Sequence, residues 1–134
     1  MAKQPRFNFD KILAKWEQEK KILATEVARK AENQFKENFR QGGFIDDYLQ
    51  KWTPRKNADP GRAILVKSGR LKRGIKAAPG ENFTRIDISN DVPYAKYHNE
   101  GTDKLPQRKF IGESKALNRK IKEAVVRSVM KIFR

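Results

Sequence analysis

A long apolar stripe constrains this chain more than any other feature of its sequence. From residue 10 to residue 40, apolar side chains fall mostly four positions apart, and lysines and glutamates fill most of the positions between them. The members of the stripe are Ile12, Trp16, Leu23, Val27, Ala31, Phe35 and Phe39. That spacing places them on one face of a helix. We therefore predict one long helix whose apolar face packs into the core, in preference to a coiled-coil seam.

The two ends of this helix are marked by residues that favour helix termini. Asp10 is the expected N-cap, and Gly42-Gly43 supplies the left-handed backbone on which helices often end. A helix of roughly 30 residues exceeds the length of most globular helices. Two alternatives therefore stay open: the helix breaks near Lys20-Lys21, or part of it lies against another subunit.

A short helix is expected after an exposed loop. Residues 44–52 form a short aromatic segment, and the Pro, Gly, Asn and Asp residues within 53–62 are typical of a loop. Ser68 is the expected N-cap of the short helix, because its hydroxyl can accept from the free amides there. Leu71 and Ile75 should point inward. The solvent side then carries a basic cluster made of Arg70, Lys72, Arg73 and Lys76.

Two strands are predicted next, at Ile75–Ala78 and Phe83–Ser89, joined by a turn at residues 79–82. The second strand alternates almost strictly between the two faces of a sheet. Residues 91–101 are expected to turn into a short helix that ends at Gly101.

The last part of the chain is expected to close the fold with a helix. Residues 102–107 are predicted to be a polar loop, and Lys109–Ile111 a third strand. A closing amphipathic helix should start at about Glu113. Its apolar and small residues are Leu117, Ile121, Ala124, Val125, Ser128, Val129 and Ile132.

These elements predict an α+β fold in which helices cover one face of a small antiparallel sheet. The length of 134 residues suits a single domain, 1–134. Within it we expect the long helix (1–41), the aromatic segment and loop (42–62), the sheet core (63–112) and the C-terminal helix (113–134).

The charge is strongly positive and unevenly placed. The formal net charge is +15, from 31 basic and 16 acidic residues. Residues 50–80 carry nine basic side chains and one acidic one, and residues 108–134 carry nine and two. A basic surface attracts nucleic acid or acidic protein partners, without saying which.

The composition also indicates in which cellular compartment the protein acts. The chain has no cysteine, which excludes disulfides, thiolate metal sites and cysteine nucleophiles. No apolar run approaches the ~20 residues that span a bilayer, and the N-terminus lacks the apolar core of a signal peptide. We expect a protein that acts in the cytoplasm or in a particle assembled there, without a membrane partner.

No motif for catalysis or for metal binding is found. His98 is the only histidine, with Glu100 and Asp103 close by in the sequence, which is too few ligands for a convincing metal site. We expect its ring nitrogens to bond to the loop backbone. The serines Ser68, Ser89, Ser114 and Ser128 lie outside any Gly-x-Ser-x-Gly elbow, and the adjacent acids Asp46-Asp47 are expected to be solvated. We therefore expect no enzyme activity, no cofactor, no metal and no small-molecule substrate.

Three short motifs occur in a fixed order. They are Ser68-Gly69-x-Leu71, then Tyr94-Ala95-x-x-His98-x-x-Gly101, then Arg108-x-Phe110-Ile111-Gly112. Together they resemble the virion-morphogenesis, or tail-completion, proteins of tailed bacteriophages, the family typified by the G protein of phage Mu. The resemblance runs from about Ala63 to Ser114, and the Trp52-Thr53-Pro54 segment after a long helix also looks like members of that family.

The resemblance implies a structural protein of the phage neck with no catalytic residues. It implies a role in tail completion and head-tail joining, as a homo-oligomer in a neck ring that meets connector and tail-terminator proteins. The expected location is the virion neck or tail, and the bacterial host cytoplasm during assembly. On this basis the motif residues shape the fold: they are Ser68, Gly69, Leu71, Tyr94, His98, Gly101, Phe110 and Gly112.

Two readings of the charge stay open within this picture. A neck ring borders the DNA channel, so the basic side chains could contact packaged DNA non-specifically or meet acidic connector proteins. The candidate contacts to partner or phosphate are Arg70, Lys72, Arg73, Lys76, Arg108 and Lys109. The alternatives to a neck protein are a small basic protein that binds DNA non-specifically and a hydrolase or nuclease built around His98.

Overall fold

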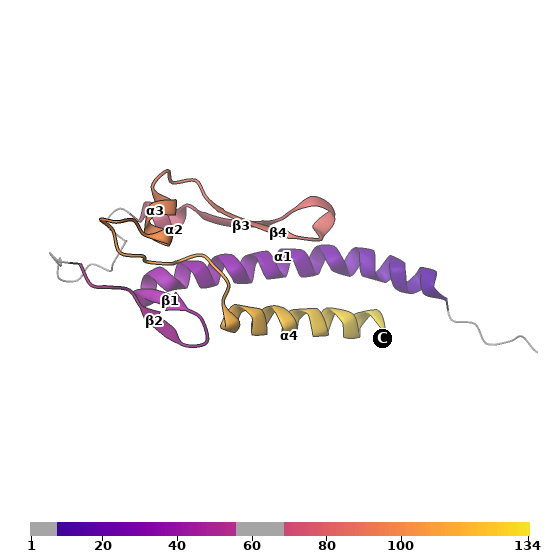
Figure 1. Ribbon diagram of the computed structural model, residues 1–134. Coiled ribbons are helices and arrows are strands. Elements are labelled where there is room, and N and C mark those ends of the chain that lie inside the picture. Colours follow the sequence, from indigo (N-terminus) through magenta and orange to yellow (C-terminus); the bar gives the residue numbers. More distant parts are fainter. Residues whose placement is uncertain (1–7, 56–68) are drawn as a thin grey trace, which may run out of the picture.

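One long helix forms the centre of the molecule. The computed structural model describes residues 8–55 and 69–134, and helix α1 spans Phe9–Gln41 without a break (Figure 1). Its 33 residues make it about 50 Å long. The predicted cap at Asp10 is wrong: Asn8 is the N-cap, and its side chain accepts from the Asp10 amide at 3.0 Å. The predicted end is confirmed, because Gly42 adopts the left-handed backbone with φ 70°.

A β-hairpin and a second long helix lie on opposite sides of α1 (Figure 1). The hairpin pairs β3 (Ile75–Pro79) with β4 (Ile86–Asn90) in antiparallel register, with Ala77 opposite Ile88. The second helix is α4, Lys115–Ile132. These elements confirm the predicted α+β class.

A second hairpin follows α1 directly and was not predicted. Strand β1 (Gly43–Ile45) pairs with β2 (Leu49–Lys51), so the β structure consists of two separate two-stranded sheets. The close approach of the strands explains the second glycine of the pair, because a side chain at Gly43 would collide with the Gln50 backbone. The aromatic segment is therefore a short hairpin.

Aromatic rings join these elements at the C-terminal end of α1. The Phe39 ring lies 5.5 Å from the Trp52 ring in a T-shaped arrangement and 5.1 Å from the Phe110 ring. Such arrangements add to the free energy gained by burial. The buried cluster around them comprises Ala31, Phe35, Phe39, Phe44, Trp52, Leu71, Ile75, Val92, Ala95, Phe110 and Leu117.

The predicted third strand at Lys109–Ile111 is wrong. This segment is extended, but side chains take the place of a neighbouring strand. The Asn99 Oδ1 atom accepts from the amides of Phe110 and Ile111, at 2.9 and 3.0 Å. Asn38 donates to the Phe110 carbonyl at 2.9 Å, and Trp52 Nε1 donates to the Lys109 carbonyl at 2.8 Å. Buried backbone groups need such partners, and here side chains provide them.

The second predicted strand begins later than expected. Residues Glu81–Phe83 form a 3-10 turn, η1, in which Asn82 and Phe83 have φ values of 55° and 56°. This left-handed backbone cannot continue a strand. The strand therefore starts at Ile86 and not at Phe83.

The short helices lie close to their predicted positions. Helix α2 spans Arg70–Arg73, and its N-cap is Gly69, with φ 72°, while the predicted cap Ser68 lies outside the described residues. Helix α3 spans Ala95–Glu100 and ends at Gly101, as predicted. Leu71 and Ile75 are buried, which confirms the prediction that they point inward.

Candidate protein-interaction site

The two halves of α1 differ sharply in how much of their apolar surface is covered. Phe35 and Phe39 in the C-terminal half are fully buried. Near the other end, Phe9 and Leu13 are 65% and 57% exposed. Apolar side chains on α1 thus continue beyond the part of the molecule that covers them.

A slot runs along α1 between the β3–β4 hairpin and α4. At the C-terminal half of α1 the chain fills this slot itself, because the segment leading to α4 crosses α1 there (Figure 1). Phe110 is buried in this position against Phe39, and Ile111 packs against the same core.

At the N-terminal half of α1 the slot is an open groove of about 370 Å³. Its floor comes from α1, one wall from η1 and β4, and the other wall from Val125 of α4. The groove is lined by Trp16, Lys20, Leu23, Ala24, Val27, Phe83, Thr84, Arg85, Ile86 and Val125.

The charged side chains that line the groove are Lys20 and Arg85, with no acidic side chain among the described lining residues. Lys20 pairs with Glu17 at 3.1 Å, and Arg85 with Asp87 at 3.0 Å. Both carboxylates are exposed and lie outside the lining. The groove therefore combines a largely apolar lining with one cationic group on its α1 floor, Lys20, and one on its hairpin wall, Arg85.

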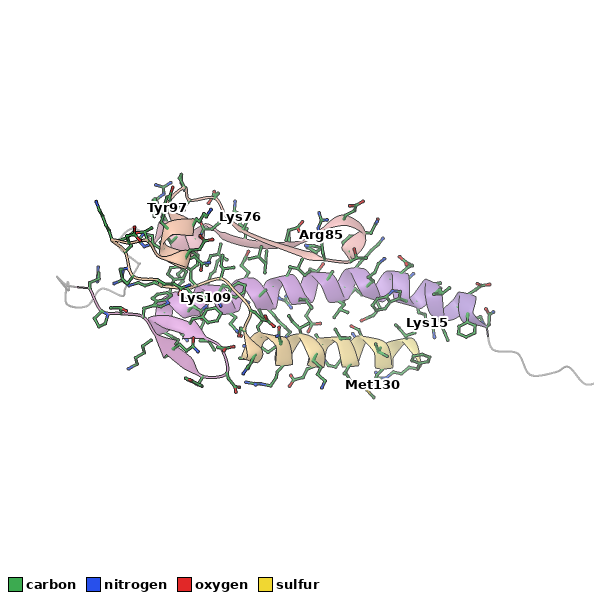
Figure 2. All side chains as sticks on the ribbon, viewed as in Figure 1. Lys15, Lys76, Arg85, Tyr97, Lys109 and Met130 are labelled. Carbon is green, nitrogen blue, oxygen red and sulfur yellow. The ribbon has the colours of Figure 1, made fainter. Side chains whose placement is uncertain are left out.

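The outer face of α4 is apolar as well. Its C-terminal half exposes an outer stripe made of Val126, Val129, Met130 and Phe133, and Figure 2 labels Met130 on the side away from α1. Leu117, Ala124, Ser128 and Ile132 are the buried residues of this helix. A helix that is apolar on two sides is normally covered on both.

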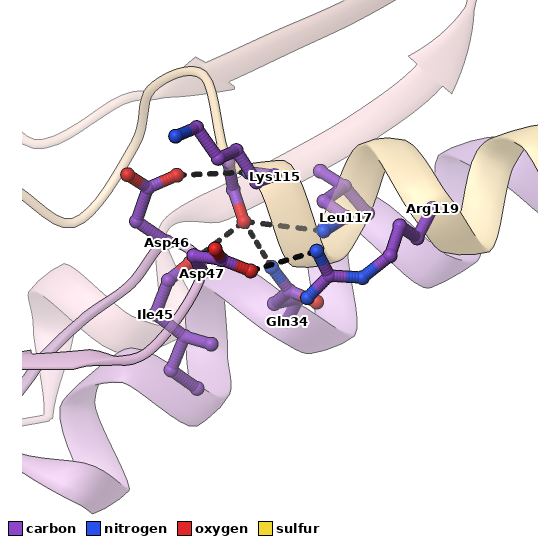
Figure 3. A network of polar contacts seen from close by, with 8 residues as sticks. Gln34, Ile45, Asp46, Asp47, Lys115, Leu117 and Arg119 are labelled. Atoms are coloured by element: carbon purple, nitrogen blue, oxygen red, sulfur yellow. Dashed lines mark hydrogen bonds and ion pairs between the residues drawn. The ribbon is translucent and has the colours of Figure 1, made fainter.

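The N-terminus of α4 is clamped by polar contacts (Figure 3). The buried Ser114 hydroxyl donates to the Ile45 carbonyl at 2.7 Å and accepts from Gln34 at 2.8 Å and from the Leu117 amide at 3.1 Å. Asp46 accepts from the Lys115 amide at 2.8 Å. The clamp fixes α4 against α1 and the β1–β2 hairpin.

The acidic pair Asp46-Asp47, expected to be solvated, belongs to this clamp. Besides the bond from Asp46, Asp47 pairs with Arg119 at 2.7 Å. The hydrogen bond from Arg119 and its charge lower the pKa of Asp47. Sequence reasoning missed this role, since only the position of Asp46-Asp47 directly after β1 and opposite the α4 N-terminus reveals it.

Further along, α4 is held to α1 by basic side chains. Arg127 lies 2.8 Å from Glu26, and Lys131 lies 3.5 Å from Glu19. Lys120 donates to Gln34 at 3.0 Å. Part of the positive charge of the C-terminal region therefore serves to hold the two helices together.

The candidate contact residues fall into separate places. Arg70, Lys72 and Arg73 lie on α2, with Lys76 at the start of β3. Arg70, Arg73 and Lys76 are exposed, and Lys72 is partly buried. The basic cluster is therefore brought together at one end of the hairpin, as the sequence spacing indicates.

Arg108 and Lys109 make contacts within the fold. Arg108 is only 7% exposed, and its guanidinium donates to the Thr53 carbonyl at 3.1 and 2.9 Å. Burial, followed by the charge of Arg55, lowers its pKa. The Lys109 ammonium lies 4.7 Å from the centre of the Phe44 ring. Both side chains thus tie the segment before α4 to the region around β1 and β2.

His98 supports its loop differently from the expectation. Its carbonyl accepts from the Arg108 amide at 2.8 Å, whereas its buried Nδ1 atom has no hydrogen-bond partner in the described part of the chain. The Tyr94 ring packs edge-on at 5.9 Å. Burial, followed by the charge of Arg108, lowers the pKa of His98. The histidine is therefore held in a setting that favours the neutral ring.

The glycines of the motifs meet steric demands. Gly101 has φ 81°, and a side chain at Gly112 would collide with that of Lys109.

Within residues 8–55 and 69–134, no three His, Asp or Glu side chains gather as a metal site would require. None of the helices in these ranges is both long and apolar enough to cross a bilayer.

Comparison of the chain with family models, with curated proteins and with solved structures found no match.

Proposed function

We propose that this chain is a structural protein of a tailed-phage particle, which completes the tail and joins it to the head through protein contacts in a neck ring. The observation that carries the proposal is the uncovered apolar surface along the N-terminal half of α1 and the outer stripe of α4. Contiguous apolar surface of this kind marks sites of protein interaction. A subunit that completes its burial within an assembly would leave such surface open when alone.

The arrangement of the motif residues supports the same proposal. Leu71, Ala95 and Phe110 come from three different motifs and meet in one buried cluster. The Arg108 amide bonds to the His98 carbonyl and so links the second motif to the third. One apolar residue of each motif therefore contributes to the same buried cluster, as residues that shape a fold would.

A second candidate function is non-specific DNA binding, and the basic cluster favours it. Arg70, Arg73 and Lys76 are exposed at one end of the hairpin, and phosphate contacts need no more than positive charge within reach. Binding of this kind should weaken steeply as salt rises and show no sequence preference. A salt titration with duplexes of different sequence measures both properties.

Deletion of the reading frame from the parent phage or prophage tests the main proposal. Induced particles would be imaged by electron microscopy. Filled heads beside separate, finished tails are the expected result, and restoring the frame in trans should restore joined particles. Intact infectious particles from the deletion strain would overturn the proposal. Non-specific DNA binding would then be the favoured function.

A further inference from the structure

We propose that the groove on the N-terminal half of α1 binds an acidic amphipathic helix of another protein. The inference deepens the proposed function, since it names the chemistry of one partner. The groove and the filled part of the slot share the same floor, which is α1. Where Phe110 occupies this slot, the surrounding residues are buried. Along the open groove Leu23 and Ala24 are also buried, whereas Trp16 and Val27 are partly exposed and Phe83 and Val125 on the walls are 37% exposed.

The lining of the groove favours a helix over an extended segment. In the filled half of the slot, side chains of Asn38, Asn99 and Trp52 satisfy the backbone of the extended chain. The described lining of the open half has no side-chain amide and a single hydroxyl, on Thr84. An extended backbone there would lose partners for its polar groups, whereas a helix satisfies its own.

The length of the floor also suits a helix. Trp16 and Val27 are 11 residues apart on α1, which corresponds to about 17 Å. A helix of roughly three turns covers that distance. Its apolar face would meet Leu23 and Val27 on the floor, with Phe83 and Val125 on the walls.

Charge indicates that the bound helix is acidic. Lys20 and Arg85 line the groove, the described lining holds no carboxylate, and the exposed partners of these cations, Glu17 and Asp87, lie outside it. The chain as a whole carries +15. Glutamates or aspartates beside the apolar face of the partner would meet these cations at the rim, which favours the encounter and excludes basic competitors.

The same charge argues against a second copy of this chain. The outer stripe of α4 is the apolar helix face that a second copy would insert, and it belongs to a chain of net charge +15, with Lys122 one turn before Val126. Arg127 and Lys131 are engaged with Glu26 and Glu19 of α1. Inserting the stripe would bring like charges to the groove. A membrane surface fits poorly too, because the floor is recessed between the hairpin wall and the α4 wall.

A titration with designed peptides tests the inference on the full chain. The probe is a peptide of about 20 residues, long enough to be helical, with leucines along one face and glutamates elsewhere. One control replaces the glutamates by lysines, and another scrambles the acidic sequence so that no apolar face forms. Trp16 lines the groove, so its fluorescence should shift to the blue on binding, and a Trp16→Phe variant identifies the signal.

We expect the acidic amphipathic peptide to bind at least about tenfold more tightly than either control. Arg85→Glu should weaken its binding by about tenfold or more. Lys96→Glu on α3 makes the same change in net charge away from the groove and should leave the affinity unchanged. Circular dichroism and urea midpoints establish that both variants are folded.

Several outcomes would overturn the inference. They are equal binding of the scrambled peptide, undiminished binding by the Arg85→Glu variant, and a dimer in light scattering that masks Trp16. A Trp16 shift with vesicles of anionic lipid but not with the peptide would assign the groove to a membrane instead. If the deletion strain leaves heads and tails unjoined while the peptide fails to bind, only the groove inference falls. If the peptide binds and the particles are intact, only the proposed function falls.

Discussion

The C-terminal and N-terminal halves of α1 carry the same apolar pattern, yet one is closed and the other open. Phe39 at one end meets Trp52 and Phe110, while Leu13 at the other end meets mostly solvent. The two halves differ in which other segments of the chain pack against them. Residues 108–114 reach only the closed end, where three side chains satisfy the extended backbone. An apolar stripe thus predicts a surface that is stabilised by burial, and the tertiary structure determines which residues bury it.

The largest loss of unfolding free energy should come from removing a buried ring at the closed end. Phe39→Ala removes the ring that packs against Trp52 and Phe110, and a buried phenylalanine truncated to alanine costs about 3–5 kcal/mol. Urea denaturation measures the free energy of unfolding. The matched change at the open end, Phe9→Ala, should cost within about 0.5 kcal/mol. Equal costs at the two ends would break the comparison.

A smaller loss is expected when the polar partners of the closed end are removed. Asn38 donates to the Phe110 carbonyl and accepts from the Ile45 amide at 3.0 Å, so Asn38→Leu removes the partner of one buried and one partly buried backbone group. We expect a loss of about 2–3 kcal/mol in unfolding free energy. Asn33→Leu, on the exposed side of the same helix, is the control. A neutral Asn38→Leu variant would show that the extended segment does not depend on this side chain.

Acid should weaken the closed end through His98. Burial lowers its pKa in the folded state, so below the ordinary value of about 6.5 the unfolded chain binds more protons than the folded one. The unfolding free energy should therefore fall as pH drops from 7.5 through 6.5, and the loss should level off once the folded-state pKa is passed. His98→Gln should flatten this part of the profile. If the slope between pH 7.5 and 6 is unaltered in that variant, other groups are responsible.

The smallest effects on stability should come from the open end of α1 and from the outer stripe of α4. Leu13→Gln and Met130→Gln replace side chains that are 57% and 59% exposed, and each should change the unfolding free energy by no more than about 0.5 kcal/mol. Both should reduce concentration-dependent association, since exposed apolar surface is removed. Analytical ultracentrifugation over a range of concentrations checks this. A large loss of stability in either variant would mean that the replaced side chain is covered within the monomer.

The sequence predicts the elements with strong local signals. The spacing of Trp16, Val27 and Phe35 is enough to identify α1, and Gly42 marks its end because few other residues adopt φ 70° readily. The α+β class follows from the order of such elements. Whether the chain forms one domain, and whether the candidate contacts meet a partner, stay predictions.

What the sequence does not reveal depends on contacts between distant residues. Strands β1 and β2 have three residues each, too few to show alternation. The 109–111 segment looks like a strand because Phe110 and Ile111 favour one, and only the positions of Asn38 and Asn99 show why no strand forms. The groove is invisible for the same reason, since its lining combines Trp16, Phe83 and Val125 from three distant parts of the chain.

The bond between Asn38 and Phe110 has a consequence for how the protein is made. The two residues are 72 positions apart, and a ribosome adds about 5–20 residues per second. The finished α1 must therefore wait about 4–14 s before the segment that closes its C-terminal half has been synthesised. During that interval the C-terminal half of α1 lacks the cover that Phe110 supplies, and a chaperone that shields amphipathic helices would meet a longer exposed apolar face than the folded protein presents. Release from such a helper would leave one half closed by the chain itself and the other still available.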